Sequence, residues 1–148
     1  MYITSTHVQQ WLHTGKAKTL PVEVAAQLGD HLNRLPWFPG GGGLDWNQLA
    51  GNRLDLSTLT EEKLDDWLRS TVMGGHSHLV FFYADNQPCI ACDVEFGMAN
   101  IDEAFWGAPG KRYVFGATLE AGRILPAASH FAEFDGAGTL VASSRARV

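Results

Sequence analysis

The chain has 148 residues, 45% of them hydrophobic and 18% charged, which is typical of one globular domain and excludes a disordered or fibrous chain. Its formal net charge of −5 disfavours binding to nucleic acid through phosphate contacts. No apolar run approaches the ~20 residues of a membrane-spanning helix, so neither a nucleic-acid partner nor a membrane partner is expected.

The first half of the chain has the apolar periodicity and the capping residues of three helices. Ser5 is a suitable N-cap for a first helix, and Gly15 is a natural end for it. Pro21 suits the first turn of a second helix, which ends before Pro36. In the segment LTEEKLDDWLRS, Thr60 predicts the start of a third helix, because two glutamates follow it in the first turn.

A glycine-rich segment, PWFPGGGGLDW at residues 36–46, separates the second and third helices. Its glycines are followed neither by the Gly-Lys-Ser/Thr of a phosphate-binding loop nor by a dinucleotide-binding fingerprint. We therefore interpret the segment as a flexible connector that its aromatic residues hold in place. The alternative interpretation is a mobile binding loop.

After Gly74 and Gly75 the pattern changes to short strands separated by turns. The segments LVFFYA and CIACDVEF flank a turn at residues 85–88, and a short helix is expected over IDEAFW. Further strands are expected in RYVFGATLE, RILPA, HFAEF and TLVAS. Connections this short imply antiparallel neighbours. The sequence thus predicts a single α+β domain over residues 1–148, with N-terminal helices packed on one side of a C-terminal antiparallel β-meander sheet.

The segment HSHLVFFYADNQPCIAC contains several reactive residue types. Ser77 follows a glycine and a histidine, as in the nucleophile elbow of α/β-hydrolases, but Leu79 replaces the second glycine and a helix, not a strand, precedes the motif. The Pro-Cys-x-x-Cys sequence at Cys89 matches half of the zinc deaminase signature. The other half needs His-x-Glu, and the chain has His-Ser-His instead. Neither activity is expected.

A zinc site with two histidine and two cysteine ligands requires all four side chains to meet. If the turn closes the hairpin symmetrically, His78 lies opposite Glu95, about 10 Å beyond Cys92 at ~3.3 Å per residue. Zinc needs its ligands within ~2.3 Å. Cys89 and Cys92 also point to opposite faces of a regular strand. Geometry therefore disfavours a metal at His76, His78 and the two cysteines, and only a different register leaves that site open.

The same hairpin register separates two faces. Leu79 and Cys92 belong to an apolar face, so Cys92 is expected in the core. The opposite face collects His78, Val80, Phe82, Cys89, Ala91, Asp93 and Glu95. On it, His78 opposite Glu95 is either a cross-strand charge pair or a general acid/base pair that Glu95 orients. No nucleophile accompanies the pair, so no catalytic residue is assigned.

Two cysteines are too few for a disulfide scaffold, and the N-terminal segment MYITSTHVQQWLHTGK lacks the basic and apolar regions of a secretory signal. We therefore expect a cytoplasmic protein. The sequence has no motif for a cofactor, and none is expected.

Charge is unevenly distributed, because no Lys or Arg lies between Arg69 and Lys111 while acidic residues are frequent there. Such residues form either an ordinary solvated surface or a face that meets a basic partner. The second interpretation predicts a small soluble protein-binding module. The expected partner-binding residues are His78, Phe82, Asp85, Asp93, Glu95, Asp102, Glu103 and Trp106.

Bacterial immunity proteins that neutralise a basic toxin are one class with this character, and the analogy is one of class alone. The alternative is a ligand-binding or enzymatic α+β domain, with a pocket between helices and sheet and the His78/Glu95 pair at its mouth.

Overall fold

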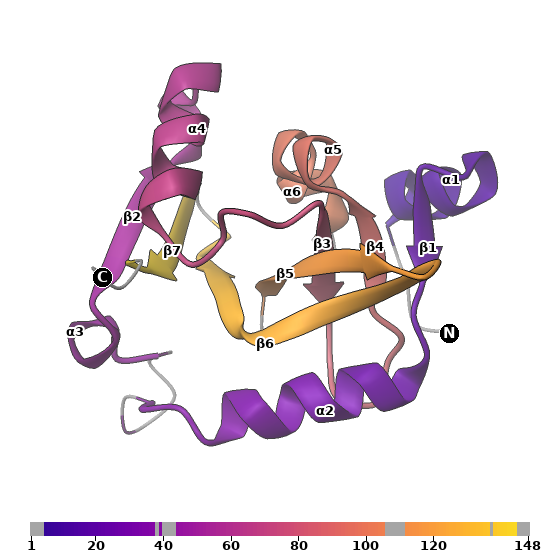
Figure 1. Ribbon diagram of the computed structural model, residues 1–148, viewed down its shortest axis with the longest axis horizontal. Helices are drawn as coiled ribbons and strands as arrows, with labels where there is room; N and C mark the ends of the chain where they lie inside the picture. Colours follow the sequence, from indigo (N-terminus) through magenta and orange to yellow (C-terminus); the bar gives the residue numbers. More distant parts are fainter. Residues whose placement is uncertain (1–4, 38, 40–43, 106–111, 137, 145–148) are drawn as a thin grey trace.

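The computed structural model describes residues 5–37, 39, 44–105, 112–136 and 138–144 (Figure 1). The helices are α1 (Thr6–Thr14), α2 (Val22–Asn33), α3 (Trp46–Leu49), α4 (Glu61–Ser70), α5 (Val94–Ala99) and α6 (Ile101–Ala104), with a 3-10 turn η1 at Leu56–Thr58. The strands are β1 (Ala17–Thr19), β2 (Gly51–Asp55), β3 (His78–Phe82), β4 (Ile90–Asp93), β5 (Tyr113–Glu120), β6 (Arg123–Phe134) and β7 (Thr139–Ser143).

The strands of the described residues form one seven-stranded sheet in the order β1-β4-β3-β5-β6-β7-β2. Every neighbouring pair is antiparallel. Strands β5, β6 and β7 form a meander joined by short turns, whereas both edge strands, β1 and β2, come from the N-terminal half. The predicted α+β class with an antiparallel meander is confirmed.

Local capping chemistry sets the helix ends where the sequence predicts them. The Ser5 side chain accepts a hydrogen bond from the backbone N–H of Val8 and opens α1. Gly15 ends α1 in the left-handed conformation at φ 80°, which glycine adopts without a steric penalty. Thr60 caps α4 in the same way as Ser5 caps α1, by accepting from the N–H of Lys63.

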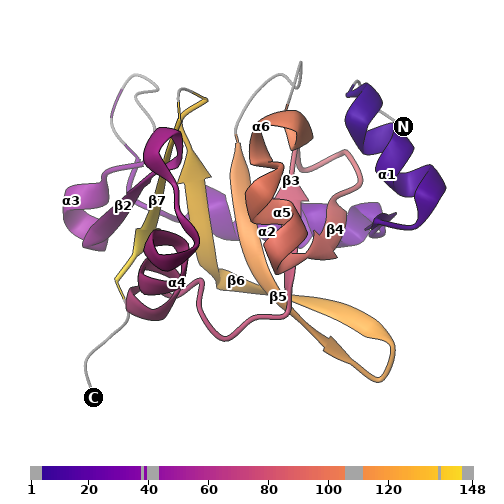
Figure 2. The ribbon, with the colours of Figure 1, turned by 90° about the horizontal axis from the view of Figure 1, so that it is seen from above.

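Helices cover both faces of the sheet, and not the one side that was expected (Figures 1 and 2). Helices α1, α4, α5 and α6 lie over one face and α2 runs along the other. The reason lies in β3, whose side chains are apolar on both faces. Leu79 and Phe81 join the first core cluster, and Val80 and Phe82 join the second. A strand that is buried on both faces needs a cover on each.

Gly29 in α2 allows the helix to approach the turn between β3 and β4. A Cβ atom at this position would lie 2.7 Å from Cβ of Asp85 and 3.6 Å from Cζ of Phe82. These distances explain why a residue with poor helix propensity stands inside a helix.

Glu133 of β6 forms hydrogen bonds with the residues that follow the glycine-rich loop. Its carboxylate accepts hydrogen bonds from the Tyr113 hydroxyl at 2.8 Å, from Trp46 Nε1 at 3.2 Å and from the backbone N–H of Leu44 at 3.4 Å. Burial, and next the hydrogen bond to Glu133, raise the pKa of Tyr113, so its hydroxyl stays protonated and donates. Trp37 forms an isolated bridge with Leu44, so both ends of the loop are fixed.

Candidate functional site

The β3–β4 hairpin has a different register from the expected one. His78 lies opposite Asp93, not opposite Glu95. The difference arises because the turn lies one residue earlier than expected, with the backbone N–H of Gln87 donating to the carbonyl oxygen of Ala84 at 3.2 Å. In addition, β4 ends at Asp93 and the chain enters α5 at Val94, so Glu95 is a helical residue. The shift is an even number of residues, so the residues that remain in the hairpin strands keep their predicted faces.

The predicted His78/Glu95 pair, whether a cross-strand charge pair or an acid/base pair, is therefore wrong. His78 Nδ1 forms a hydrogen bond of 2.8 Å with Oγ of the adjacent Ser77. Within the described part of the chain, an ion pair joins Arg69 to Asp66 and none joins His78 to a carboxylate. Without an orienting carboxylate, His78 lacks the arrangement that the enzymatic alternative needs.

Both cysteines are buried, on opposite faces of the sheet. Cys89 is 0% exposed in the α2-side cluster and Cys92 is 2% exposed in the other, so the expected core position of Cys92 is confirmed. Burial raises the pKa of each thiol to about 12. The thiols are consequently protonated near neutral pH, and thiolate is the form that attacks electrophiles and binds metals. The described residues contain no group of three or more His, Cys, Asp and Glu side chains placed to hold a metal ion.

Phe82 is not a surface residue, and its assignment as a contact residue is wrong. It is 4% exposed and packs edge-on against Phe115 at 6.2 Å between ring centroids. The expected exposed aromatic face is instead the core under α2, because both sides of β3 are covered. Trp106, the other expected aromatic contact, lies outside the described residues.

Four of the five acidic residues of the expected contact surface lie on or directly before the helix pair α5–α6. Asp93 immediately precedes α5, Glu95 is in its first turn, and Asp102 and Glu103 are in the first turn of α6. Asp93, Glu95 and Asp102 are exposed, and Glu103 is half-buried. Carboxylates in first helical turns also interact favourably with the helix dipole. We call these four residues the α5–α6 acidic surface.

Helix α5 is held close to the sheet. A Cβ at Gly97 would lie 2.8 Å from Cδ1 of Leu79 and 2.9 Å from Sγ of Cys92, so α5 rests directly on β3 and β4. At the side of the helix, Phe96 meets the ring of Trp11 in α1 edge-on, with centroids 5.1 Å apart. These contacts fix the position of Glu95.

Helix α6 is fixed by hydrogen bonds to its backbone. The hydroxyl of Tyr83 donates to the carbonyl oxygen of Ala104 at 2.7 Å, and Ser5 Oγ donates to the carbonyl oxygen of Glu103 at 2.8 Å. Burial raises the pKa of Tyr83, which keeps this donor protonated. The acidic side chains thus project from helices that are anchored to both the sheet and the start of α1.

Asp85 is separate from this surface. It is exposed in the turn at the far end of the hairpin from Asp93, where it meets Gly29 of α2. The structure therefore brings together His78 and Asp93 across the hairpin and places Asp102 and Glu103 on the adjoining helix, but it does not bring Asp85 to them.

One histidine contact was not anticipated from the sequence. Nε2 of His76 and Nδ1 of His130 form a hydrogen bond of 2.9 Å, and the ring of His76 occupies the space beside Gly116 where a side chain would stand. At this point the pairing of β5 with β6 is irregular, because Gly116 alone separates Phe115 from Ala117 in β5 while four residues separate their partners, Phe131 and Pro126, in β6. The glycine inside a strand was the available signal for this irregularity. The pair fastens the start of β3 to the irregular part of β6.

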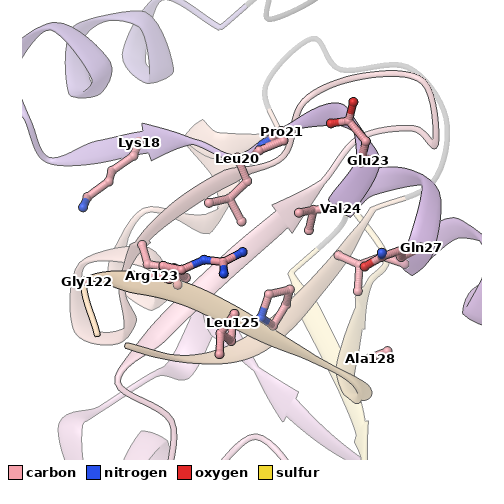
Figure 3. Close-up of a pocket in the computed structure, with 13 residues that line it drawn as sticks. Lys18, Leu20, Pro21, Glu23, Val24, Gln27, Gly122, Arg123, Leu125 and Ala128 are labelled. Carbon is pink, nitrogen blue, oxygen red and sulfur yellow. The ribbon is translucent and has the colours of Figure 1, made fainter. Parts of the chain in front are cut away.

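A pocket between a helix and the sheet does exist, but in a different place from the one expected. It lies between the N-terminal end of α2 and the β5–β6 hairpin, and its lining includes neither His78 nor Glu95 (Figure 3). Sequence reasoning missed it because β1, one of its walls, pairs with a strand far along the chain.

Within the described ranges, no helix has both the length and the apolar character needed to cross a membrane. Comparison of the chain with protein-family models, with curated proteins and with solved structures finds no match.

Proposed function

We propose that this protein is a small binding module that recognises a basic protein through the α5–α6 acidic surface. The observation that carries the proposal is a concentration of carboxylates without neighbouring cations in the sequence. No Lys or Arg occurs between Arg69 and Lys111. Where the structure describes the chain, no ion pair involves Asp93, Glu95, Asp102 or Glu103. Their charge is therefore available to a partner.

The placement of these carboxylates suits recognition. They extend from short helices whose backbones are fixed by Tyr83, Ser5 and the contacts at Gly97, so little backbone freedom is lost on binding. Complementary charge accelerates association and selects against acidic partners. The half-buried side chains of Val94 and Phe96 lie in the same helix and offer apolar area beside the charges.

A partner class that suits this surface is a basic bacterial toxin, which the protein would neutralise by covering it. The competing enzymatic function has lost support, because Cys89 and Cys92 are buried and protonated and His78 has no orienting carboxylate. Binding to a protein needs none of these groups to react.

The test compares two variants in each of which four carboxylates are replaced by amides, so that the net charge changes equally. In the first, the α5–α6 acidic surface is replaced by amides: Asp93→Asn, Glu95→Gln, Asp102→Asn and Glu103→Gln. The control carries the same number of neutral replacements at exposed positions elsewhere: Glu61→Gln, Glu62→Gln, Asp65→Asn and Glu120→Gln. The immobilised wild-type protein captures its partner from cells that naturally encode it, and calorimetry measures the affinity of the purified partner for each form.

We expect a basic partner whose affinity falls as salt is raised. In the first variant its affinity should fall roughly 30-fold, at ~0.5 kcal/mol for each of the four replaced carboxylates. The control variant should bind within about twofold of wild type. A partner that is acidic, or an equal loss of affinity in both variants, contradicts the proposal.

A further inference from the structure

The pocket beside α2 has the dimensions of a small-molecule site. Its volume is about 570 Å³, which lies within the roughly 300–1,000 Å³ of typical ligand pockets. One wall is the projecting end of the β5–β6 hairpin, which extends past the rest of the sheet because β3 pairs with β5 only as far as Ala117 (Figure 2). The other walls are β1 and the first turns of α2.

The interior of the pocket is mainly apolar. The residues that line it include Leu20, Val24, Leu28, Ile124, Leu125 and Pro126. The large hydrophobic residues that are exposed in the described structure also gather here. Leu125 lines the pocket, Val22 lies between the lining residues Pro21 and Glu23, and Leu119 stands opposite Ile124 on the hairpin. Exposed apolar side chains that cluster around a pocket are typical of a ligand-binding site.

The charges around the pocket are mostly positive, in contrast to the molecule as a whole. Lys18 and Arg123 contribute cations and Glu23 one anion, whereas the chain carries a net charge of −5. Figure 3 shows the guanidinium of Arg123 between Leu20 and Leu125, while the Glu23 carboxylate and the Lys18 ammonium both point away from it. No ion pair within the described residues engages either cation.

We propose that this pocket binds an organic anion with an apolar body, such as an aliphatic or aromatic carboxylate. The apolar body lies against Leu20, Val24 and Leu125 and removes their surface from water. The carboxylate meets the guanidinium of Arg123, whose planar donors suit two carboxylate oxygens, while Lys18 adds only a more distant positive charge at the rim. The proposal is independent of the α5–α6 acidic surface, since the pocket lies beside α2 on the other face of the sheet.

The test uses octanoate as the anionic probe and 1-octanol as its neutral counterpart. Isothermal calorimetry on the wild-type protein should show saturable binding of one octanoate, and weaker binding of 1-octanol. Replacement Arg123→Gln should weaken octanoate binding roughly fivefold, as expected for a partly exposed charge-assisted contact, and leave 1-octanol unaffected. Arg34→Gln, which removes an exposed cation at the opposite end of α2, should change neither.

A second measurement locates the probe without a substitution. In methyl-detected NMR titrations, the resonances of Val24, Ile124 and Leu125 should shift together and saturate with the calorimetric affinity. An Ala128→Trp replacement, which fills the pocket, should abolish both signals while circular dichroism shows an intact fold. The proposal is overturned by the absence of octanoate binding at millimolar concentration, by equal affinity for 1-octanol, or by shifts that map to another part of the protein.

Discussion

Replacement of Glu133 by glutamine tests the proposed hold on the glycine-rich loop with a change of one atom. The carboxylate accepts from Trp46 Nε1 through one oxygen and from the Tyr113 hydroxyl and the Leu44 N–H through the other. In Glu133→Gln, an NH₂ group takes the place of one of these oxygens. The tyrosine hydroxyl can rotate and accept, but the indole and backbone N–H groups cannot. Whichever way the amide turns, one N–H donor loses its acceptor.

The magnitude follows from the burial of the groups involved. Trp46 is 9% exposed and Tyr113 is 2% exposed, so a lost partner is only partly replaced by water. An unsatisfied buried donor costs about 1–3 kcal/mol, and the half-buried position of Glu133 favours the lower half of that range. We expect Glu133→Gln to lower the free energy of unfolding by about 1.5 kcal/mol, equivalent to a decrease of roughly 3–6 °C in Tm for a domain of this size. Glu133→Ala removes every acceptor and should lower it by about 3 kcal/mol.

Urea unfolding at pH 7, followed by tryptophan fluorescence and by circular dichroism, measures this difference. The matched control is Glu120→Gln, which makes the same chemical change at an exposed position on the β5–β6 hairpin and should stay within about 0.5 kcal/mol of wild type. If Glu133→Gln is as stable as Glu120→Gln, the carboxylate does not hold the loop and the reasoning fails.

Two further predictions concern close packing and the buried thiols. Gly29→Ala gains about 1 kcal/mol of helix propensity but places a Cβ 2.7 Å from Cβ of Asp85, so we expect thermal unfolding to show a net decrease of about 1 kcal/mol in the free energy of unfolding. The double variant that adds Asp85→Gly removes the clash and should recover this stability. Additive effects of the two replacements would contradict the clash. Because burial raises the pKa of Cys89 and Cys92 from 9.0 to about 12, the stability that their neutral forms contribute is complete below pH 9 and is lost as pH rises from 9 to 12. Urea titrations across that range should record the decline, and a thiol reagent at pH 8 should modify both cysteines only after unfolding; rapid modification of the folded protein would refute their burial.

Local signals in the sequence were sufficient for the helix ends and for the faces of the hairpin. Ser5, Gly15 and Thr60 act through hydrogen bonds or dihedral preferences that involve only nearby residues, and the structure has each of them at its predicted helix end. The two faces of β3 were assigned correctly because alternation has a period of two, which survives an even shift in register.

The sequence also contained a signal that the second face of β3 is buried, and this signal was not used. The run LVFFY is continuously apolar, a pattern typical of a strand covered on both sides, and Phe82 was nevertheless expected at the surface. The transition from β4 to α5 had a weaker signal, because DVEF alternates like a strand and only the contacts of Gly97 with Leu79 and Cys92 explain a helix there.

Long-range pairing accounts for the rest of what was not predicted. Strands β1 and β2 are short and have one buried residue each, so their own sequences give almost no periodic signal. They are strands because β4 and β7 offer them partners. The pocket beside α2 depends on β1 in the same way, and with it the site proposed for an organic anion.

The pairing of β2 with β7 has a consequence for the biosynthesis of the protein. A ribosome releases the N-terminal half first, and at that time neither β1 nor β2 has a strand to join. The sheet is complete only after the last strand, Thr139–Ser143, has been synthesised. A nonsense codon just before Thr139 would therefore remove β7, the strand that pairs with the edge strand β2. Leu54 of β2 and the apolar side of α4 would then lose the cover that β7 provides. In this topology the loss of a strand that is synthesised late damages a part of the sheet that was synthesised much earlier.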